Sequence, residues 1–281
     1  MRCGVAALAL AFTSFAGCGE FGSTSDPPVT SDAGSTPAAD AGRPPAKTDA
    51  QAAGGCASAG PDVLVCDDFE GSSISKAWTD TVSSPPGSTG EIGIEPLPPS
   101  MGSGHALHVK IMPEDVDRPQ DTMLRLALSS GFLTDKRHIE LRARVFVVSS
   151  TVNYARLAGL TIIRPLSGPE HFSVSGVSLW KYDPPFLEDG DDPSNQNGAI
   201  TGVVGNWRST VTTLDRAGTG PFERKVTADP GGTLREDTRD LSGTVDSIFL
   251  GVGAFNSAVT ELAEGVGSLD VWIDDVLFLA R

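Results

Sequence analysis

Two arginines spaced two residues apart, Arg142 and Arg144, are the side chains whose type and spacing point most directly to ligand chemistry. They lie in a segment, 138–148, where apolar residues occupy almost every second position. In an extended strand, residues two apart lie on one face, so the two guanidinium groups share a face. Such a pair can bind a carboxylate or a sugar hydroxyl bidentately. The alternative is that both arginines pair with acidic residues of a neighbouring strand.

Three aromatic residues, Trp180, Tyr182 and Trp207, are candidates for a flat binding surface. Aromatic faces pack on the apolar C–H face of a sugar ring, while polar neighbours hydrogen-bond to its hydroxyls. Trp180 and Tyr182 fall on the same face of one predicted strand and have polar neighbours in the sequence. The alternative for Trp180 is a place in the hydrophobic core.

The balance of charge limits the possible partners. The chain has 21 Lys and Arg against 36 Asp and Glu, a net charge of -15. Nucleic-acid binding rests on clustered basic residues, so the composition argues against a DNA or RNA partner and against anionic lipid. An acidic domain of this kind suits divalent cations.

The N-terminus has the parts of an export signal. A charge at Arg2 precedes an apolar stretch that ends in Ala16-Gly17-Cys18, and this stretch is too short to span a bilayer. The ending resembles the lipobox of bacterial lipoproteins, with Phe15 where leucine is usual. The resemblance implies a signal peptide over 1–17, acylation of Cys18, and a location in the bacterial cell envelope, facing the periplasm or the cell surface. The alternative is an ordinary cleaved signal with an incidental cysteine.

The segment 18–55 is a predicted tether, because it consists almost wholly of Ser, Thr, Pro, Ala, Gly and Asp. It contains too little apolar surface to offset the entropy of ordering. The rest, 56–281, is long enough for one well-buried domain. Once Cys3 leaves with the signal and Cys18 is acylated, Cys56 and Cys66 remain as a close pair in an oxidising compartment, so we predict a disulfide between them. Two cysteines without a nearby His pair do not make a zinc site.

The secondary-structure pattern of 56–281 has a period of two almost throughout, with β-branched runs separated by Gly, Pro, Asn and Asp. This pattern, without alternating helices, predicts an all-β antiparallel sandwich or jelly roll. The predicted strands are 64–69, 105–111, 138–148, 155–164, 172–182, 199–205, 209–214, 247–255 and 269–279, with two weaker segments at 91–95 and 122–128. The acidic run 188–192 is predicted to be a solvated loop, because Pro193 breaks the EF-hand pattern.

Four segments carry a family resemblance. The opening CDDFEG (66–71), followed by Trp78, and the closing VWIDDV (271–276) resemble the first and last strands of carbohydrate-binding jelly rolls. The segments GSGHALHV (102–109) and ELRARV (140–145) resemble inner strands of the same group. This group is the concanavalin A-like lectins and glucanases. The resemblance implies a concanavalin A-like jelly roll over the whole domain.

The resemblance also implies a structural calcium site where the first strand meets the last. Glu70 and Asp274 match its positions, with Asp68 or Asp275 as further ligands. Carboxylates flanked by buried apolar residues are costly unless a hard cation or hydrogen bonds compensate them, and calcium takes such oxygen ligands. The alternative is that Asp67, Asp68 and Asp275 face water or cap turns, and that only one or two carboxylates are partly buried.

Catalytic motifs are mostly absent from the sequence. The Glu-x-Asp-x-x-Glu strand of the retaining glucanases is missing, as are serine-hydrolase, zinc-protease and nucleotide-binding motifs. Polysaccharide lyases on this fold need only a Tyr or His base and a group that neutralises a uronate carboxylate. The candidates for a lyase site are Tyr154, Tyr182, Arg142, Arg144 and His171, and Arg156 is a further arginine that could meet the two tyrosines.

The sequence therefore favours a lipid-anchored envelope protein that displays a non-catalytic carbohydrate-binding or adhesive jelly roll. Its partners would be a polysaccharide or glycan, and the membrane through Cys18. The ligand-binding candidates are Trp180, Tyr182, Trp207, Arg142 and Arg144. Two alternatives stay open: a polysaccharide lyase acting on uronate-containing glycans, and a structural lipoprotein without a glycan ligand.

Overall fold

A computed structural model describes residues 56, 60–84, 90–112, 121–152, 154–164, 172–180, 186–189, 200–241, 243–255 and 268–281. For residues 84, 172–175, 180, 186–189 and 200 it describes the backbone alone. The predicted signal peptide and tether lie outside these ranges. Within them, no helix has the length and apolar character needed to cross a membrane.

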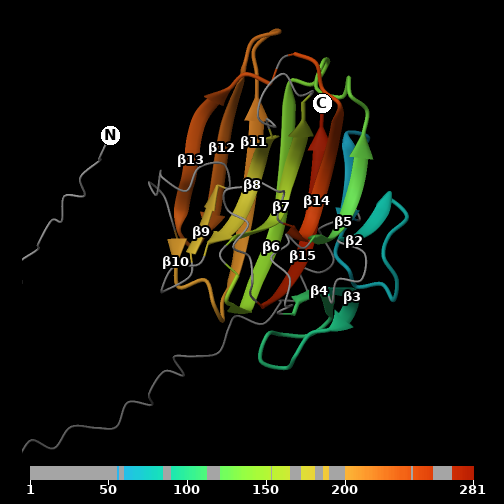
Figure 1. The fold of residues 1–281 in the computed structure, drawn as a ribbon, viewed down its shortest axis with the longest axis vertical. Coiled ribbons are helices and arrows are strands. Elements are labelled where there is room, and N and C mark those ends of the chain that lie inside the picture. The colour runs from blue at the N-terminus through green and yellow to red at the C-terminus, as the bar shows by residue number, and fades with distance from the viewer. Residues whose placement is uncertain are drawn as a thin grey trace, which may run out of the picture. The chain divides into compact units, whose positions relative to one another are not determined.

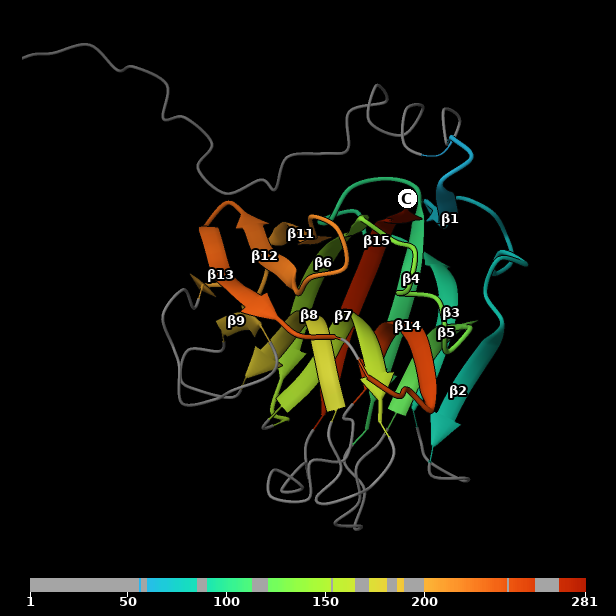
Figure 2. The same cartoon turned by 90° about the horizontal axis from the view of Figure 1, so that it is seen from above.

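The described chain folds into two antiparallel sheets, which lie face to face in Figures 1 and 2. Sheet A contains β1 (Val63–Asp67), β3 (Glu91–Pro96), β4 (His105–Ile111), β6 (His138–Ser150), β11 (Trp207–Asp215), β12 (Phe222–Asp229), β13 (Gly232–Arg239) and β15 (Leu269–Ala280). Its order is β13-β12-β11-β6-β15-β4-β3, and β1 also pairs with β15. The predicted all-β jelly-roll sandwich is confirmed.

Sheet B is the second layer of the sandwich. It contains β2 (Asp80–Ser84), β5 (Asp121–Leu128), β7 (Tyr154–Ile163), β8 (Phe172–Trp180), β9 (Phe186–Asp189), β10 (Ile200–Thr201) and β14 (Ser247–Phe255). Its order is β10-β9-β8-β7-β14-β5-β2. Strands far apart in the sequence are therefore neighbours, as β7 and β14 are at the centre of this sheet.

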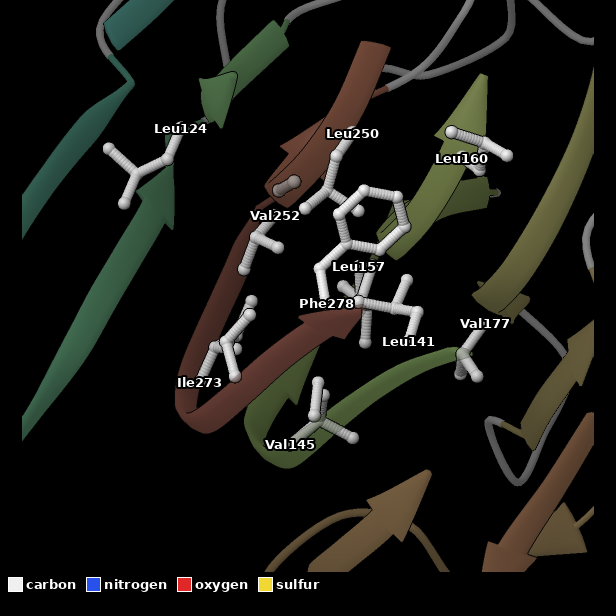
Figure 3. Packing of buried hydrophobic residues seen from close by; sticks show 14 of the residues in the cluster. Leu124, Leu141, Val145, Leu157, Leu160, Val177, Leu250, Val252, Ile273 and Phe278 are labelled. Carbon is white, nitrogen blue, oxygen red and sulfur yellow. The ribbon is translucent and has the colours of Figure 1, made fainter. Parts of the chain in front are cut away.

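The core fills the space between the sheets. Strand β6 contributes the alternating residues that the sequence assigns to the core, among them Leu141 and Val145, and these are buried. Phe278 of β15 meets Leu157 and Leu250 of sheet B in the same cluster (Figure 3). Each large apolar side chain buried in this way contributes about 1.5 to 3 kcal/mol. The two inner faces therefore supply the cohesion that holds the outer faces in place.

Most predicted strands are present, within one or two residues at each end, including the two weaker segments. The strand predicted at 199–205 is only the two-residue β10. The prediction of a loop over 188–192 is wrong for its first two residues, which belong to β9 and pair with β8. The hairpin of β12 and β13 and the short β2 are absent from the predictions, because polar residues interrupt their apolar alternation.

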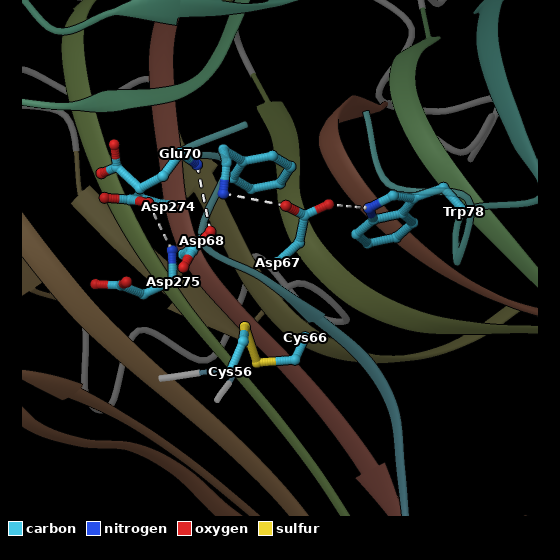
Figure 4. The surroundings of a disulfide bond; sticks show 9 residues. Cys56, Cys66, Asp67, Asp68, Glu70, Trp78, Asp274 and Asp275 are labelled. Carbon is cyan, nitrogen blue, oxygen red and sulfur yellow. Dashed lines mark hydrogen bonds between the residues drawn. A yellow bond between two sulfur atoms is a disulfide. The ribbon is translucent and has the colours of Figure 1, made fainter. Parts of the chain in front are cut away.

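The predicted disulfide is confirmed. Cys56 and Cys66 are bonded, with their Cα atoms 5.3 Å apart, and Cys66 lies in β1 (Figure 4). The bond therefore attaches the segment that leads into the domain to a strand that is itself paired with the last strand.

Candidate functional site

The outer face of sheet A, on the side away from the core, holds the two predicted arginines. Arg144 donates to Asp275 Oδ2 at 3.1 Å, and its guanidinium lies 4.8 Å from the centre of the Trp207 ring. Arg142 donates to Glu140 of its own strand. Both arginines therefore have acidic partners. The alternative to a ligand site was pairing with acidic residues of a neighbouring strand, and this holds for Arg144, whereas the partner of Arg142 is on its own strand.

Trp207 belongs to a small apolar cluster on this same outer face. The loop between β3 and β4 covers the sheet here, and Leu97 and Met101 from this loop pack with Phe146 and Trp272. Trp207 packs its edge against Phe146 at 5.4 Å and donates its indole N–H to the carbonyl of Met101 at 3.1 Å. The half-buried ring therefore has a packing role, and a sugar-binding role for it stays a prediction.

A buried histidine extends this cluster. The ring of His108 is stacked on Trp272 with a centroid separation of 3.8 Å. Its two nitrogens lie 2.7 Å from Glu95 Oε2 and 2.9 Å from Asp270 Oδ1. The imidazole thus links three neighbouring strands, β3, β4 and β15, through polar contacts over an apolar patch.

The predicted metal ligands gather where β1 approaches β15 (Figure 4). Phe69 and Asp275 both have a positive φ, 53° and 50°, in a region that side chains other than glycine rarely adopt. Asp274 is fully buried and accepts from the backbone N–H of Asp275 at 2.9 Å. Strained backbone of this kind is concentrated at functional positions.

The carboxylates of this region have protein partners. Glu70 Oε2 accepts from the backbone N–H of His105 at 3.1 Å, and Asp68 accepts from the N–H of Glu70 at 3.3 Å. Gly104 makes this possible, because a Cβ at its position would lie 2.4 Å from Glu70 Oε1. No three His, Cys, Asp or Glu side chains of the described ranges are grouped to hold a metal ion. Calcium therefore stays a prediction from the sequence.

Asp67 is a buried carboxylate that caps the turn after β1, which is one of the alternatives that the sequence left open. Its Oδ2 accepts from the indole of Trp78 at 2.9 Å, and its Oδ1 accepts from the N–H of Phe69 at 3.0 Å. Burial raises the pKa of Asp67 above its ordinary value, and these hydrogen bonds oppose the rise without cancelling it. The contacts close the turn that follows β1.

The outer face of sheet B has a different character, because it carries a buried polar cluster. Tyr154 and Arg156 lie two apart on β7, and the register places Arg156 beside Ser178 of β8. Arg156 Nε donates to the hydroxyl of Tyr154 at 2.5 Å, and this hydroxyl is 3.0 Å from Ser178 Oγ. The three residues are only 4%, 3% and 1% exposed. A cation, a phenol and a hydroxyl are therefore held together on one sheet face.

Other polar atoms on this face lack hydrogen-bond partners. Thr161 Oγ1 and Arg125 Nε are buried and have no hydrogen-bond partner in the described structure. Arg125 uses Nη2 to bind Asp80 at 2.7 Å. Buried polar groups are nearly always satisfied, so these two atoms call for a partner outside the described contacts. Atoms of the same kind also occur in sheet A, at Ser150 Oγ and Arg208 Nε, so they do not by themselves distinguish the two faces.

The five predicted ligand-binding residues do not form one site. Arg142, Arg144 and Trp207 lie on sheet A, whereas Trp180 is the register partner of Tyr154 in sheet B. Tyr182 and His171 lie outside the described residues. The lyase combination is divided in the same way, because the core separates Tyr154 from Arg142 and Arg144. The guanidinium that contacts Tyr154 is that of Arg156, which is among the arginines named from the sequence.

Comparisons with known proteins bear on the fold. No protein-family model matches the sequence, and a search of curated proteins found no match. Among solved structures, an endo-β-1,4-glucuronan lyase from the fungus Trichoderma reesei is similar, with 14% identity and a TM-score of 0.50 over 77% of this chain and 95% of that chain. The alginate lyase Aly36B is similar with 10% identity and a TM-score of 0.52, over 79% of this chain and 98% of that chain.

These structures show that the domain shares the jelly-roll β-sandwich fold of the two lyases. The two lyases align over nearly their whole length, so the likeness concerns the complete sandwich. At these levels of identity the likeness shows a shared fold, and function must be argued from the residues of this chain.

Proposed function

We propose that the domain binds a polysaccharide on the outer face of sheet B. The observation that carries the proposal is the buried cluster of Tyr154, Arg156 and Ser178 on a face that also holds Thr161 Oγ1 and Arg125 Nε without hydrogen-bond partners. Sugar recognition relies on planar groups and on hydrogen-bond donors and acceptors held in fixed positions. A sheet supplies such positions because its backbone is fixed by the core beneath it.

The chemistry of this face favours a polysaccharide that contains uronate. A guanidinium binds carboxylates through charge-assisted hydrogen bonds, which are about twice as strong as neutral ones. Arg156 and Arg125 supply two guanidinium groups from β7 and β5, which both neighbour β14.

A second candidate, polysaccharide lyase activity, is favoured by one contact. Cleavage by β-elimination needs a base that removes the proton next to a uronate carboxylate, and a group that neutralises that carboxylate. Arg156 donates to the hydroxyl of Tyr154, so positive charge lies beside an oxygen that would become negative on losing its proton. The non-catalytic reading remains our first proposal, because sugar binding needs no base.

We propose further that acylated Cys18 anchors the protein in a bacterial envelope. The support is the small-residue sequence before Cys18 and the polar segment after it. A diacylated cysteine holds a protein stably at a bilayer, because each buried CH₂ contributes about 0.8 kcal/mol.

One experiment separates binding from cleavage. The full chain is passed over affinity gels that contain glucuronan, alginate or a neutral glucan, and the ultraviolet absorbance of unsaturated uronate is followed in parallel. Binding alone gives retention on the uronate gels without absorbance. Tyr154→Phe and Ser178→Ala should each weaken retention about two- to tenfold, the range for one neutral hydrogen bond.

Variants on the other sheet serve as controls. Arg142→Gln removes an exposed guanidinium from sheet A and should leave retention unchanged. If Arg142→Gln or Trp207→Phe weakened retention while Tyr154→Phe did not, the site would be on sheet A and the proposal would be wrong. Unsaturated product that disappears in Tyr154→Phe would establish a lyase. Neither retention nor product on any uronate or neutral gel would favour a structural lipoprotein.

A further inference from the structure

A pocket at one end of the sandwich has the features of a second binding site. It lies between the connections β5–β6, β11–β12 and β13–β14, at the end where the C-terminus pairs with the start of β6 (Figure 1). Its volume is about 240 Å³. The lining residues are Ser130, Leu133, Thr134, Arg216, Thr219, Leu241, Gly243 and Val245.

The charge of this pocket comes from Arg216. Its Nε donates to the carbonyl of Lys136 at 2.7 Å, and its Nη2 donates to the carbonyls of Leu133 and Thr134. The guanidinium also lies 4.5 Å from the centre of the Phe222 ring. These contacts hold the group in place but use only neutral partners. Among the described residues no carboxylate pairs with Arg216, whereas Arg142, Arg144 and Arg224 all have one.

The free hydrogen-bonding capacity of Arg216 is at Nη1. A guanidinium has five N–H donors, and the three carbonyls account for those on Nε and Nη2. The two donors on Nη1 have no partner in the described part of the chain. A fixed cation with two available donors is suited to an anionic oxygen. Arg208 also donates only to carbonyls, so what distinguishes Arg216 is its place in the lining of the pocket.

The other residues that line the pocket indicate which further chemical groups a ligand would carry. Ser130, Thr134 and Thr219 are exposed hydroxyl residues whose side chains make no hydrogen bond within the described ranges. Leu133 and Leu241 are buried and give the pocket an apolar wall. This combination fits a molecule with several hydroxyls, an apolar face and a carboxylate. The volume is below the roughly 300 to 1,000 Å³ of sites for drug-sized ligands, so about one ring can enter.

We propose that this pocket binds a single uronate ring, with its carboxylate on Arg216 Nη1. The ring is either a free monosaccharide or the end of a chain, and both present the same chemistry. The proposal does not depend on the site on sheet B, because no residue is common to the two.

The test measures binding of D-glucuronate to the full chain by isothermal titration calorimetry. We expect D-glucuronate to bind saturably. D-glucose, which lacks the carboxylate, should bind roughly ten- to a hundredfold more weakly, because one charge-assisted hydrogen bond is lost. A trisaccharide of glucuronate distinguishes the two sources. If it binds at least as tightly as the monosaccharide, the pocket accepts a chain end, and if it does not bind, the pocket takes the free sugar.

Three variants locate the site. Arg216→Gln should weaken the binding of D-glucuronate by the same factor that separates D-glucuronate from D-glucose in the parent protein. Thr219→Phe obstructs the pocket from an exposed loop position and leaves Arg216 in the sequence. If Arg216→Gln does not fold, Thr219→Phe alone tests whether the pocket is the binding site. Arg208→Gln is the matched control, because Arg208 also donates only to carbonyls, those of Gly202 and Pro230, from the opposite end of β11.

The proposal is wrong if D-glucuronate does not bind, if D-glucose binds equally well, or if Thr219→Phe binds like the parent protein. It is also wrong if Arg208→Gln and Arg216→Gln weaken binding to the same extent. Loss of polymer retention in Tyr154→Phe with unchanged D-glucuronate binding would confirm that the two sites are separate. Retention of polymer with no monosaccharide binding would overturn this proposal and leave the sheet B proposal intact.

Discussion

The buried ion pair between Arg224 and Asp237 allows a quantitative prediction. Arg224 occupies an inward position of β12, and its side chain is 0% exposed. Asp237 of β13 accepts from Arg224 Nε at 2.8 Å and from Nη2 at 2.7 Å, so the contact is bidentate. Arg235 donates to the same carboxylate at 3.1 Å. Asp237 is therefore a bidentate carboxylate partner of a guanidinium that has lost its water.

We expect Asp237→Ala to destabilise the domain by about 1.5 to 3 kcal/mol, because the buried guanidinium of Arg224 loses a charged, bidentate partner that is itself 24% exposed. For a domain of this size the melting temperature should fall by about 3 to 12 °C. Replacing both residues, as in Arg224→Leu with Asp237→Leu, should cost much less, because neither buried charge remains. Unfolding in guanidinium chloride, followed for the parent, each single variant and the double variant, gives the coupling energy directly.

The pH dependence gives an independent check. Burial alone raises the pKa of Asp237, but hydrogen bonds from Arg224 and Arg235, with the charges of Arg224 and Arg239, outweigh it and hold the pKa below its ordinary value of 3.8. The stability from this group is therefore fully present above the unfolded pKa and is lost as the pH falls through the folded pKa. The difference in stability between the parent and Asp237→Asn should shrink below about pH 4.

Two results would refute this reasoning. If Asp237→Ala cost less than about 1 kcal/mol, the value of an exposed pair, the buried guanidinium would not depend on this carboxylate. If the parent and Asp237→Asn kept the same difference in stability from neutral pH to below about pH 3, the charge of Asp237 would not contribute.

Three further predictions concern the anchor, the disulfide and calcium. Cys18→Ser should move the protein from membrane fractions into solution, and mass spectrometry showing an unacylated Cys18 in the parent would contradict the anchor. Reduction of Cys56–Cys66, which closes a separation of 10 residues, should lower the free energy of unfolding by about 2 to 3 kcal/mol in denaturant titrations. Calcium should raise the melting temperature, because binding at a hundredfold excess over Kd adds about 2.7 kcal/mol to the free energy of unfolding. The calcium prediction is wrong if neither calcium nor a chelator changes the melting curve and if Glu70→Gln melts like the parent. Glu70 would then only contact the loop before β4.

The outer faces show why a correct strand does not give a correct site. The alternation in 138–148 identified the strand and the shared face of Arg142 and Arg144, and both were right. Their partners come from β15 and from the same strand, and the loop over Trp207 comes from between β3 and β4. A period of two assigns a side chain to a face, but it does not show what lies on that face.

The sequence by itself determined the all-β sandwich, nearly all of its long strands, and the disulfide, because strand periodicity and cysteine number are local properties. Only the tertiary structure decided that Tyr154 and Arg142 lie on opposite outer faces, and that Arg216 binds the β5–β6 connection in a pocket that three connections line. It also revealed β12 and β13, whose inward positions include Arg224 in place of an apolar residue. Asp237 lies opposite that arginine and binds it, and such a pairing between strands leaves no periodic signal in either strand.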